Sequence, residues 1–127
     1  MKILGELFQI VDFSVTDSFE NGGGTHCEAS LVPLMESPVF AAHFPGRPVV
    51  PGACIVAAVE ELLCNALQQS LHIVEIKNVK FITLVEPKEG EPLTFEMDID
   101  KESYKVKAVV KYSGMICSKM SVTFNRS

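Results

Sequence analysis

The stretch HFPGRPVVPGACIVAAVEELL, residues 43–63, joins a loop with one histidine to an apolar segment, and the rest of the chain is arranged around it. Three prolines lie in its first half, and each fixes φ and disfavours helix in the residue before it. Residues 43–50 are therefore expected to form an extended, rigid loop. Proline is tolerated at the first position of a helix, where its missing N–H has no partner, so a helix is predicted from Pro51 to about Gln69.

The predicted helix begins without a side-chain cap. A helix start usually has Ser, Thr, Asp or Asn at the N-cap, where the side chain accepts a hydrogen bond from a free backbone N–H. Val50 has no such acceptor, so the N–H groups of Gly52 and Ala53 are expected to be unpaired. These donors are then available to another acceptor.

This helix is apolar around most of its circumference. Its apolar residues are Ile55, Val56, Val59, Leu62, Leu63, Ala66 and Leu67. Such a helix must be buried, and in a chain of 127 residues the economical solution is one sheet that wraps around it. The sequence therefore predicts an α+β fold, with one long central helix inside an antiparallel β-sheet, as a single domain over residues 1–127.

The segments before and after the helix favour strands. Apolar and polar residues alternate, wholly or in part, over residues 7–15, 25–34, 73–81, 93–100, 104–112 and 115–124. In the first of these, one face is expected to carry Leu7, Val11, Phe13 and Val15. Residues 21–24 are interpreted as a turn between two strands, and Ser113-Gly114 predicts a tight hairpin.

The composition describes a small apolar domain with a mild acidic excess. The chain has 47% hydrophobic residues and a formal net charge of −5. Its basic residues are scattered, which argues against nucleic-acid binding. The four cysteines form no C-x-x-C pair and are expected to be reduced. With neither a secretory signal nor an uncharged run long enough to cross a bilayer, the chain is expected to be a cytoplasmic protein without membrane insertion.

Within the loop, the run H-F-P-G-R-P-V-V-P-G keeps three prolines and two glycines in a fixed order over ten positions. It resembles the signature of the FabZ/FabA-type β-hydroxyacyl-acyl-carrier-protein dehydratases of the hotdog superfamily. The resemblance extends more weakly over most of the chain, including residues 80–91. It implies a hotdog fold and a homodimer or higher oligomer of dimers. The implied reaction removes water from a 3-hydroxyacyl thioester, giving a trans-2-enoyl thioester, in fatty-acid or related acyl-chain synthesis.

The resemblance also implies roles for individual residues. His43 matches the histidine that takes the α-proton as general base, with its tautomer fixed by the backbone carbonyl of Val49. Gly52 matches the residue whose N–H holds the thioester carbonyl, a task suited to the positive end of a helix dipole. Phe44 and Ala53 are expected to line the substrate site. The acyl chain is expected to be carried by an acyl carrier protein or coenzyme A, and no metal or redox cofactor is implied.

One position departs from the family pattern. The family has Glu or Asp fourteen residues after the histidine, and this chain has Ala57 there. On a helix, Glu61 lies about 40° and Glu60 about 60° around the axis from Ala57, on opposite sides. We predict that Glu61 supplies the proton that the leaving hydroxyl needs, with Glu60 as the second candidate. The alternative is that both are ordinary charged residues where the helix meets solvent or a partner subunit.

Two further residues have weaker functional interpretations. Arg47 could bind the phosphate of a pantetheine arm, or it could be a solvated loop cation. His26 precedes Cys27, but neighbours in a strand point to opposite faces, so no metal site is predicted.

The sequence leaves two other functions open. The first is a hotdog acyl thioesterase in which Glu61 activates water, and release of free thiol without an enoyl product would select it. The second is a non-catalytic, acyl-binding partner subunit that kept the loop and lost the acid. An absence of enoyl-thioester hydration by the purified chain alone would select that alternative.

Overall fold

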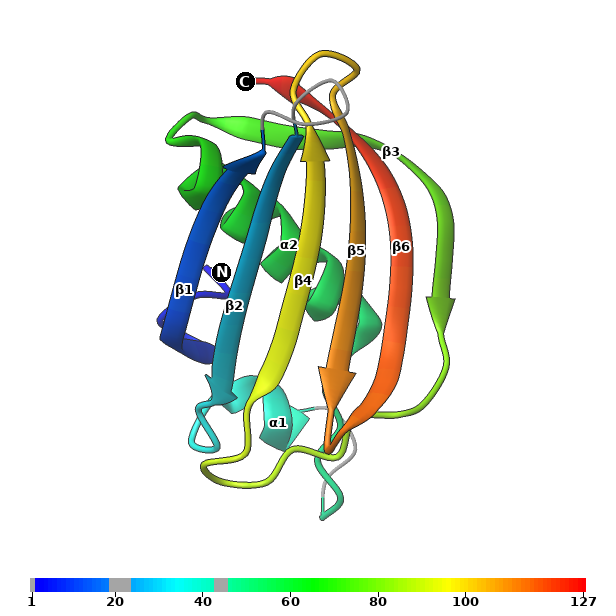
Figure 1. Ribbon diagram of the computed structural model, residues 1–127. Coiled ribbons are helices and arrows are strands. Elements are labelled where there is room, and N and C mark those ends of the chain that lie inside the picture. The colour runs from blue at the N-terminus through cyan, green and yellow to red at the C-terminus, as the bar shows by residue number, and fades with distance from the viewer. Residues whose placement is uncertain (1, 19–23, 43–45) are drawn as a thin grey trace.

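The computed structural model describes residues 2–18, 24–42 and 46–127. Within these residues the chain forms two helices and a six-stranded antiparallel sheet (Figure 1). The elements in chain order are β1 (Phe8–Ser18), β2 (Gly24–Pro33), α1 (Pro38–Ala42), α2 (Gly52–Leu67), β3 (Leu71–Phe81), β4 (Leu93–Asp100), β5 (Lys105–Tyr112) and β6 (Met115–Arg126). The strand order is β1-β2-β4-β5-β6-β3, which places β1 and β3 at the two edges.

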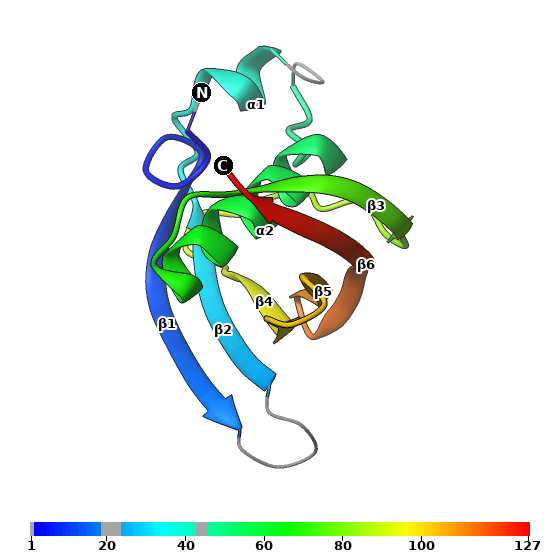
Figure 2. The same cartoon turned by 90° about the horizontal axis from the view of Figure 1, so that it is seen from above.

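The central helix α2 lies against one face of this sheet. After β2 the chain leaves the sheet through α1 and α2, returns at the opposite edge as β3, and then crosses back so that β4 pairs with β2. Seen from above, the sheet curves around α2, with β1 and β2 on one side and β6 and β3 on the other (Figure 2). This is the predicted arrangement of one long helix inside an antiparallel sheet.

The ends of α2 lie close to the predicted ones. Pro51 is the N-cap, with φ −63° and ψ 141°, and no side chain caps the first turn. Gln68 ends the helix in the left-handed conformation, and its N–H donates to the carbonyl of Cys64, which satisfies one of the last helical acceptors. Neither of the described helices is long and apolar enough to cross a membrane.

One face of α2 and the inner faces of the strands form the hydrophobic core. The buried helix residues are Ile55, Ala58, Val59, Leu62 and Leu63. The predicted alternation is confirmed in β2 and β4, where the buried residues are Thr25, Cys27, Ala29, Leu31, Pro33, Leu93, Phe95, Met97 and Ile99. Residues between them face the opposite side of the sheet, which is therefore polar.

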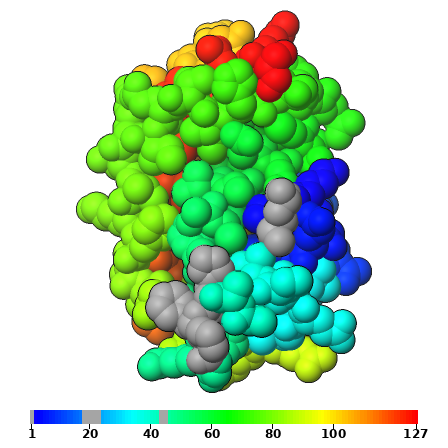
Figure 3. All heavy atoms as spheres, turned by 180° about the vertical axis from the view of Figure 1, so that it is seen from behind, coloured from blue at the N-terminus to red at the C-terminus, as the bar shows by residue number. Residues whose placement is uncertain are grey.

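The sheet does not bury α2 completely in the single chain. Ala53 is exposed, and Val56 and Ala57 are only partly buried, because the sheet curves around one side of the helix. Figure 3 shows the uncovered side of α2 between β3 and the N-terminal segment. Among residues 2–18, 24–42 and 46–127, no element covers this apolar strip of the helix.

Strand β1 also differs from its prediction. Leu7 is buried and Phe13 packs against the core as expected, but Val11 and Val15 are 55% and 39% exposed. The register of β1 against β2 shifts between Ile10 and Asp12, so Val11 is the extra residue of a β-bulge. Beyond it, the end of β1 projects away from α2 (Figure 2), which leaves Val15 uncovered.

Candidate active site at the start of the central helix

The start of α2 presents backbone N–H groups that no described residue binds. The carbonyl oxygen of Pro51 accepts hydrogen bonds from the N–H groups of Cys54 and Ile55, at 3.0 and 3.3 Å. Across residues 2–18, 24–42 and 46–127, no acceptor lies on the N–H of Gly52 or Ala53. The helix dipole adds partial positive charge at this end. The tip of α2 is therefore suited to hold a carbonyl oxygen or an oxyanion.

The loop before the tip is fastened to the connection between β3 and β4. The N–H of Val50 donates to the carbonyl of Val85 at 2.9 Å, and both Val49 and Val50 are buried. The guanidinium of Arg47 donates from Nε to the carboxylate of Glu86 at 2.9 Å and from Nη2 to the same oxygen. This arrangement fixes the position of the tip. The predicted phosphate contact of Arg47 stays a prediction, and Glu86 now competes for the guanidinium.

Phe81, at the end of β3, borders the tip. A Cβ built on Gly52 would lie 2.7 Å from the ring of Phe81, so the ring contacts the glycine backbone directly. The side chain is also 50% exposed, which leaves it room to turn outward. No local pattern in the sequence predicts this role for Phe81, although it lies in the segment 80–91 that carries part of the family resemblance. A larger residue at position 52 would displace this ring.

The two helix carboxylates hold other parts of the backbone. The carboxylate of Glu61 accepts hydrogen bonds from the N–H of Ile3 at 2.7 Å and of Leu4 at 2.9 Å, one on each oxygen. The carboxylate of Glu60 accepts from the N–H of Ile73 at 2.8 Å. Both side chains are partly buried. In the described structure they act as acceptors that attach the N-terminal segment and β3 to α2.

Both carboxylates belong to residues that lie far from the tip of the helix. With a rise of about 1.5 Å per residue, Glu61 is about 13 Å and Glu60 about 12 Å from Gly52 along the axis, against about 7 Å for Ala57. They line a separate cavity of about 280 Å³ together with Lys2, Leu4, Cys64 and Asn65. Proton donation by Glu61 or Glu60 stays a prediction, and it would require the carboxylate to leave its backbone partner.

Among the described residues at positions 54 and 57 of the helix, neither side chain is an acid. The side chain of Ala57 has no polar atom. Burial raises the pKa of the Cys54 thiol, so this group stays protonated near neutral pH and is a poor nucleophile. His43 and Phe44, the predicted base and a predicted lining residue, lie outside the described residues.

Comparison with known proteins gives the family. Residues 20–121 match the family ApeI-like, described as ApeI dehydratase. The chain belongs to the ApeI-like dehydratase family. It is 30% identical over 100 residues to a protein of Rickettsia canadensis described as 3-hydroxyacyl-[acyl-carrier-protein] dehydratase FabZ, covering 70% of this chain and 68% of that one. A FabZ of Rickettsia massiliae is 29% identical with the same coverage.

Solved structures share the fold of this ApeI-like dehydratase. An uncharacterized protein from Erwinia carotovora aligns with a TM-score of 0.78 and 18% identity, covering 94% of this chain and 97% of the other. The dehydratase heterocomplex ApeI:P from Xenorhabdus doucetiae aligns with a TM-score of 0.71 and 18% identity, covering 94% and 98%. The predicted hotdog fold and the resemblance to FabZ-type dehydratases are thereby confirmed.

Proposed function

We propose that this ApeI-like dehydratase is a hydro-lyase that removes water from a 3-hydroxyacyl thioester and releases a trans-2-enoyl thioester. The observation that carries the proposal is the uncapped tip of α2, where the N–H groups of Gly52 and Ala53 have no acceptor among the described residues. Family membership and the Rickettsia relatives support the same reaction class. The acyl chain is carried by an acyl carrier protein or by coenzyme A.

In the proposed reaction the thioester carbonyl accepts a hydrogen bond from the N–H of Gly52. This donor stabilises the enolate that forms when His43 takes the α-proton, and one such donor typically contributes about 10²–10³ in rate. The electron pair of the broken C–H bond then forms the C=C bond while the C–O bond to the β-hydroxyl breaks. The leaving hydroxyl takes up a proton and departs as water.

Two candidate functions differ in which group supplies that last proton. In the first, Glu61 releases Ile3 and Leu4 and donates the proton, directly or through a water. In the second, this chain is an acyl-binding subunit and a different, acid-bearing subunit completes the site. The engagement of both Glu61 oxygens favours the second, and the Xenorhabdus doucetiae relative of this fold is described as a dehydratase heterocomplex. The same engagement disfavours a thioesterase in which Glu61 activates water.

We further propose that the molecule works as a homodimer, or an oligomer of dimers, built on the edge strand β3. This strand exposes apolar side chains, with Val74 at 50%, Ile76 at 43% and Val79 at 39%. An edge strand with apolar side chains and unpaired backbone groups is a template for pairing with another chain. Pairing there would also bring a second chain close to Phe81 and the uncovered strip of α2. A cytoplasmic location and the single-domain organisation over residues 1–127 remain part of this proposal.

The decisive experiment is hydration of enoyl thioesters of several chain lengths by the purified chain, with 3-hydroxyacyl thioester measured as product. If the chain supplies its own acid, we expect activity, and we expect His43→Ala to lower kcat by about 10²–10⁴, because a general base contributes about that factor. Inactivity of the chain alone that is relieved by an acid-bearing homologous subunit would select the partner-subunit function. Release of free thiol without enoyl or hydroxyacyl product would contradict both.

A further inference from the structure

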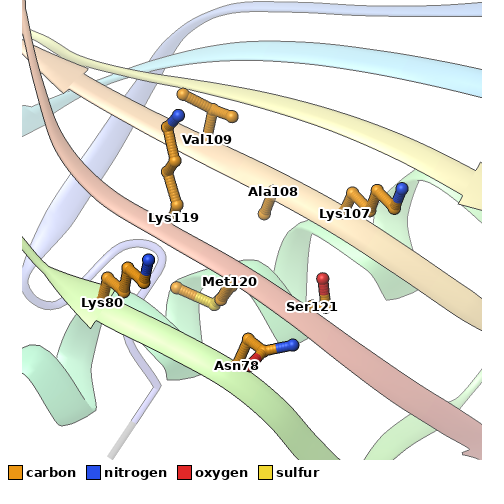
Figure 4. A pocket seen from close by; sticks show the side chains of 8 residues that line it. All are labelled: Asn78, Lys80, Lys107, Ala108, Val109, Lys119, Met120 and Ser121. Carbon is orange, nitrogen blue, oxygen red and sulfur yellow. The ribbon is translucent and has the colours of Figure 1, made fainter.

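The face of the sheet opposite α2 carries a hollow that the proposed reaction does not use. It has a volume of about 300 Å³ and lies over β3, β6 and β5 (Figure 4). Its lining residues are Asn78, Lys80, Lys107, Ala108, Val109, Lys119, Met120 and Ser121. We call this site the lysine hollow. Figure 4 shows its three lysines on three neighbouring strands, with α2 behind the sheet.

The register of the strands explains why these lysines come together. Lys80 of β3 pairs directly with Lys119 of β6, and Ser121 of β6 pairs with both Asn78 of β3 and Lys107 of β5. Directly paired side chains lie about 4.5–5.5 Å apart at Cβ, and diagonal ones about 7–8 Å. Like charges opposite one another destabilise a sheet. The Lys80–Lys119 pair therefore needs a counter-charge to be favourable.

Two acidic side chains of β4 that lie across from β5 have other partners. Across from β5, Glu96 of β4 lies 3.2 Å from the ammonium of Lys111. Asp98, which pairs in register with Lys107, accepts a hydrogen bond from His26 at 2.8 Å. Within the ranges 2–18, 24–42 and 46–127, no carboxylate forms an ion pair with Lys80, Lys107 or Lys119. The hollow is thus a local concentration of positive charge on a chain of net charge −5, with Asp98 opposite Lys107 as a partial counter-charge.

We propose that the lysine hollow binds a phosphate ester that carries two or more negative charges. The lysine ammonium groups supply charge-assisted hydrogen bonds, and the Ser121 hydroxyl and the Asn78 amide supply neutral donors between them. The volume is at the lower end of the range for small-ligand pockets, which is about 300–1,000 Å³. Such a ligand would neutralise the Lys80–Lys119 pair.

The site is separate from the acyl site. Lys80 and Phe81 are consecutive residues of β3, so their side chains point to opposite faces. Phe81 contacts Gly52 at the tip of α2, whereas Lys80 faces the hollow. The inference therefore goes beyond the proposed dehydration and does not depend on it. The phosphate could belong to a free metabolite or to a lipid headgroup, which share this chemistry.

Titration with pyrophosphate at low ionic strength, followed by calorimetry and amide NMR shifts, tests the proposal. We expect saturable binding that shifts amides of β3, β5 and β6. The variant Lys119→Gln is expected to bind about three- to tenfold more weakly, since one charge-assisted contact is lost. The matched control is Lys77→Gln, because Lys77 lies on the same strand β3 with its ammonium 3.8 Å from Glu75, and its affinity should stay within about twofold of the wild type. An absence of saturable binding, or equal weakening in both variants, would overturn the proposal.

Thermal melting provides a second test that does not depend on a titration signal. Pyrophosphate is expected to raise the Tm of the wild type more than that of a Lys80→Gln, Lys119→Gln double variant, because a ligand that binds only the folded state stabilises it. Without ligand, Lys80→Gln alone is expected to raise Tm slightly, by removing the like-charge pair. An equal rise of Tm in the wild type and the double variant would contradict a site in the hollow.

Flotation with vesicles distinguishes the two sources of the phosphate. Lys119-dependent binding to vesicles that contain phosphatidic acid, and not to phosphatidylcholine alone, would assign the hollow to a lipid headgroup. Pyrophosphate binding without vesicle binding would assign it to the phosphate groups of a soluble compound. Vesicle binding that Lys77→Gln weakens as much as Lys119→Gln would overturn the site, since general charge attraction would then explain it.

Discussion

Replacing Glu61 by glutamine tests what this carboxylate does. In the wild type its two oxygens accept the N–H groups of Ile3 and Leu4, at 2.7 and 2.9 Å. Glutamine keeps one acceptor oxygen and places an NH₂ group against the other N–H, so one of the two bonds is lost. Hydrogen bonds to a charged group contribute about 1.5–3 kcal/mol, so we expect the free energy of unfolding to fall by about that amount.

The expected shift in Tm follows from the size of the chain. An unfolding entropy of about 2.1 cal/mol/K per residue gives about 0.27 kcal/mol/K for 127 residues. A loss of about 1.5–3 kcal/mol then lowers Tm by about 6–11 °C. Differential scanning calorimetry measures this shift. The matched control is Glu36→Gln, which makes the same change at an exposed position between β2 and α1.

Kinetics of the same variant separate a structural role from a chemical one. If Glu61 only holds the N-terminal segment, kcat measured well below the variant's Tm is expected to stay within about threefold of the wild type. A Tm equal to that of the Glu36→Gln variant would refute the structural reasoning. If the Tm is unchanged in this way and kcat falls by about 100-fold or more, proton donation is assigned to Glu61, since general acid catalysis contributes a factor of about 10²–10⁴ to the rate.

Three further predictions concern the core, pH and assembly. Phe95→Ala is expected to lower the free energy of unfolding in urea by about 3–5 kcal/mol, because the ring is fully buried; a loss below about 1 kcal/mol would contradict this. Hydrogen bonds to Asp98 and Glu28 raise the pKa of His26. The charged ring therefore adds under about 1 kcal/mol to the free energy of unfolding at this half-exposed site. This contribution is present below about pH 6.5 and is lost as pH rises through the raised pKa. The difference in Tm between the wild type and His26→Gln is therefore expected to shrink as pH rises from about 5.5 to about 8.5. A difference that grows over this range would refute the stabilising role of the charged ring. Val79→Glu is expected to yield monomers by light scattering if β3 forms the homodimer, and unchanged dimers would place the interface elsewhere.

Much of the architecture could be predicted from local patterns. The apolar stretch after Pro51 defines the helix, and strict alternation defines β2 and β4, because side chains repeat every 3.6 residues in a helix and every two in a strand. The uncapped tip at Gly52 also follows from the sequence, since neither Val50, the expected N-cap, nor Pro51, the observed one, has a side-chain acceptor. Burial was predicted less well. The apolar circumference of α2 led to the expectation of complete burial, whereas one curved sheet covers a single side of it.

The sequence by itself therefore determined the helix, its uncapped start and the inward faces of the strands, because these depend on neighbours a few residues apart. Only the tertiary structure decided what the side chains touch. Glu61 binds a backbone N–H 58 residues away, Phe81 covers Gly52, and three strands bring Lys80, Lys107 and Lys119 to one hollow. Such contacts depend on strand order and register, which arise when distant segments pack together and carry no signal in local periodicity.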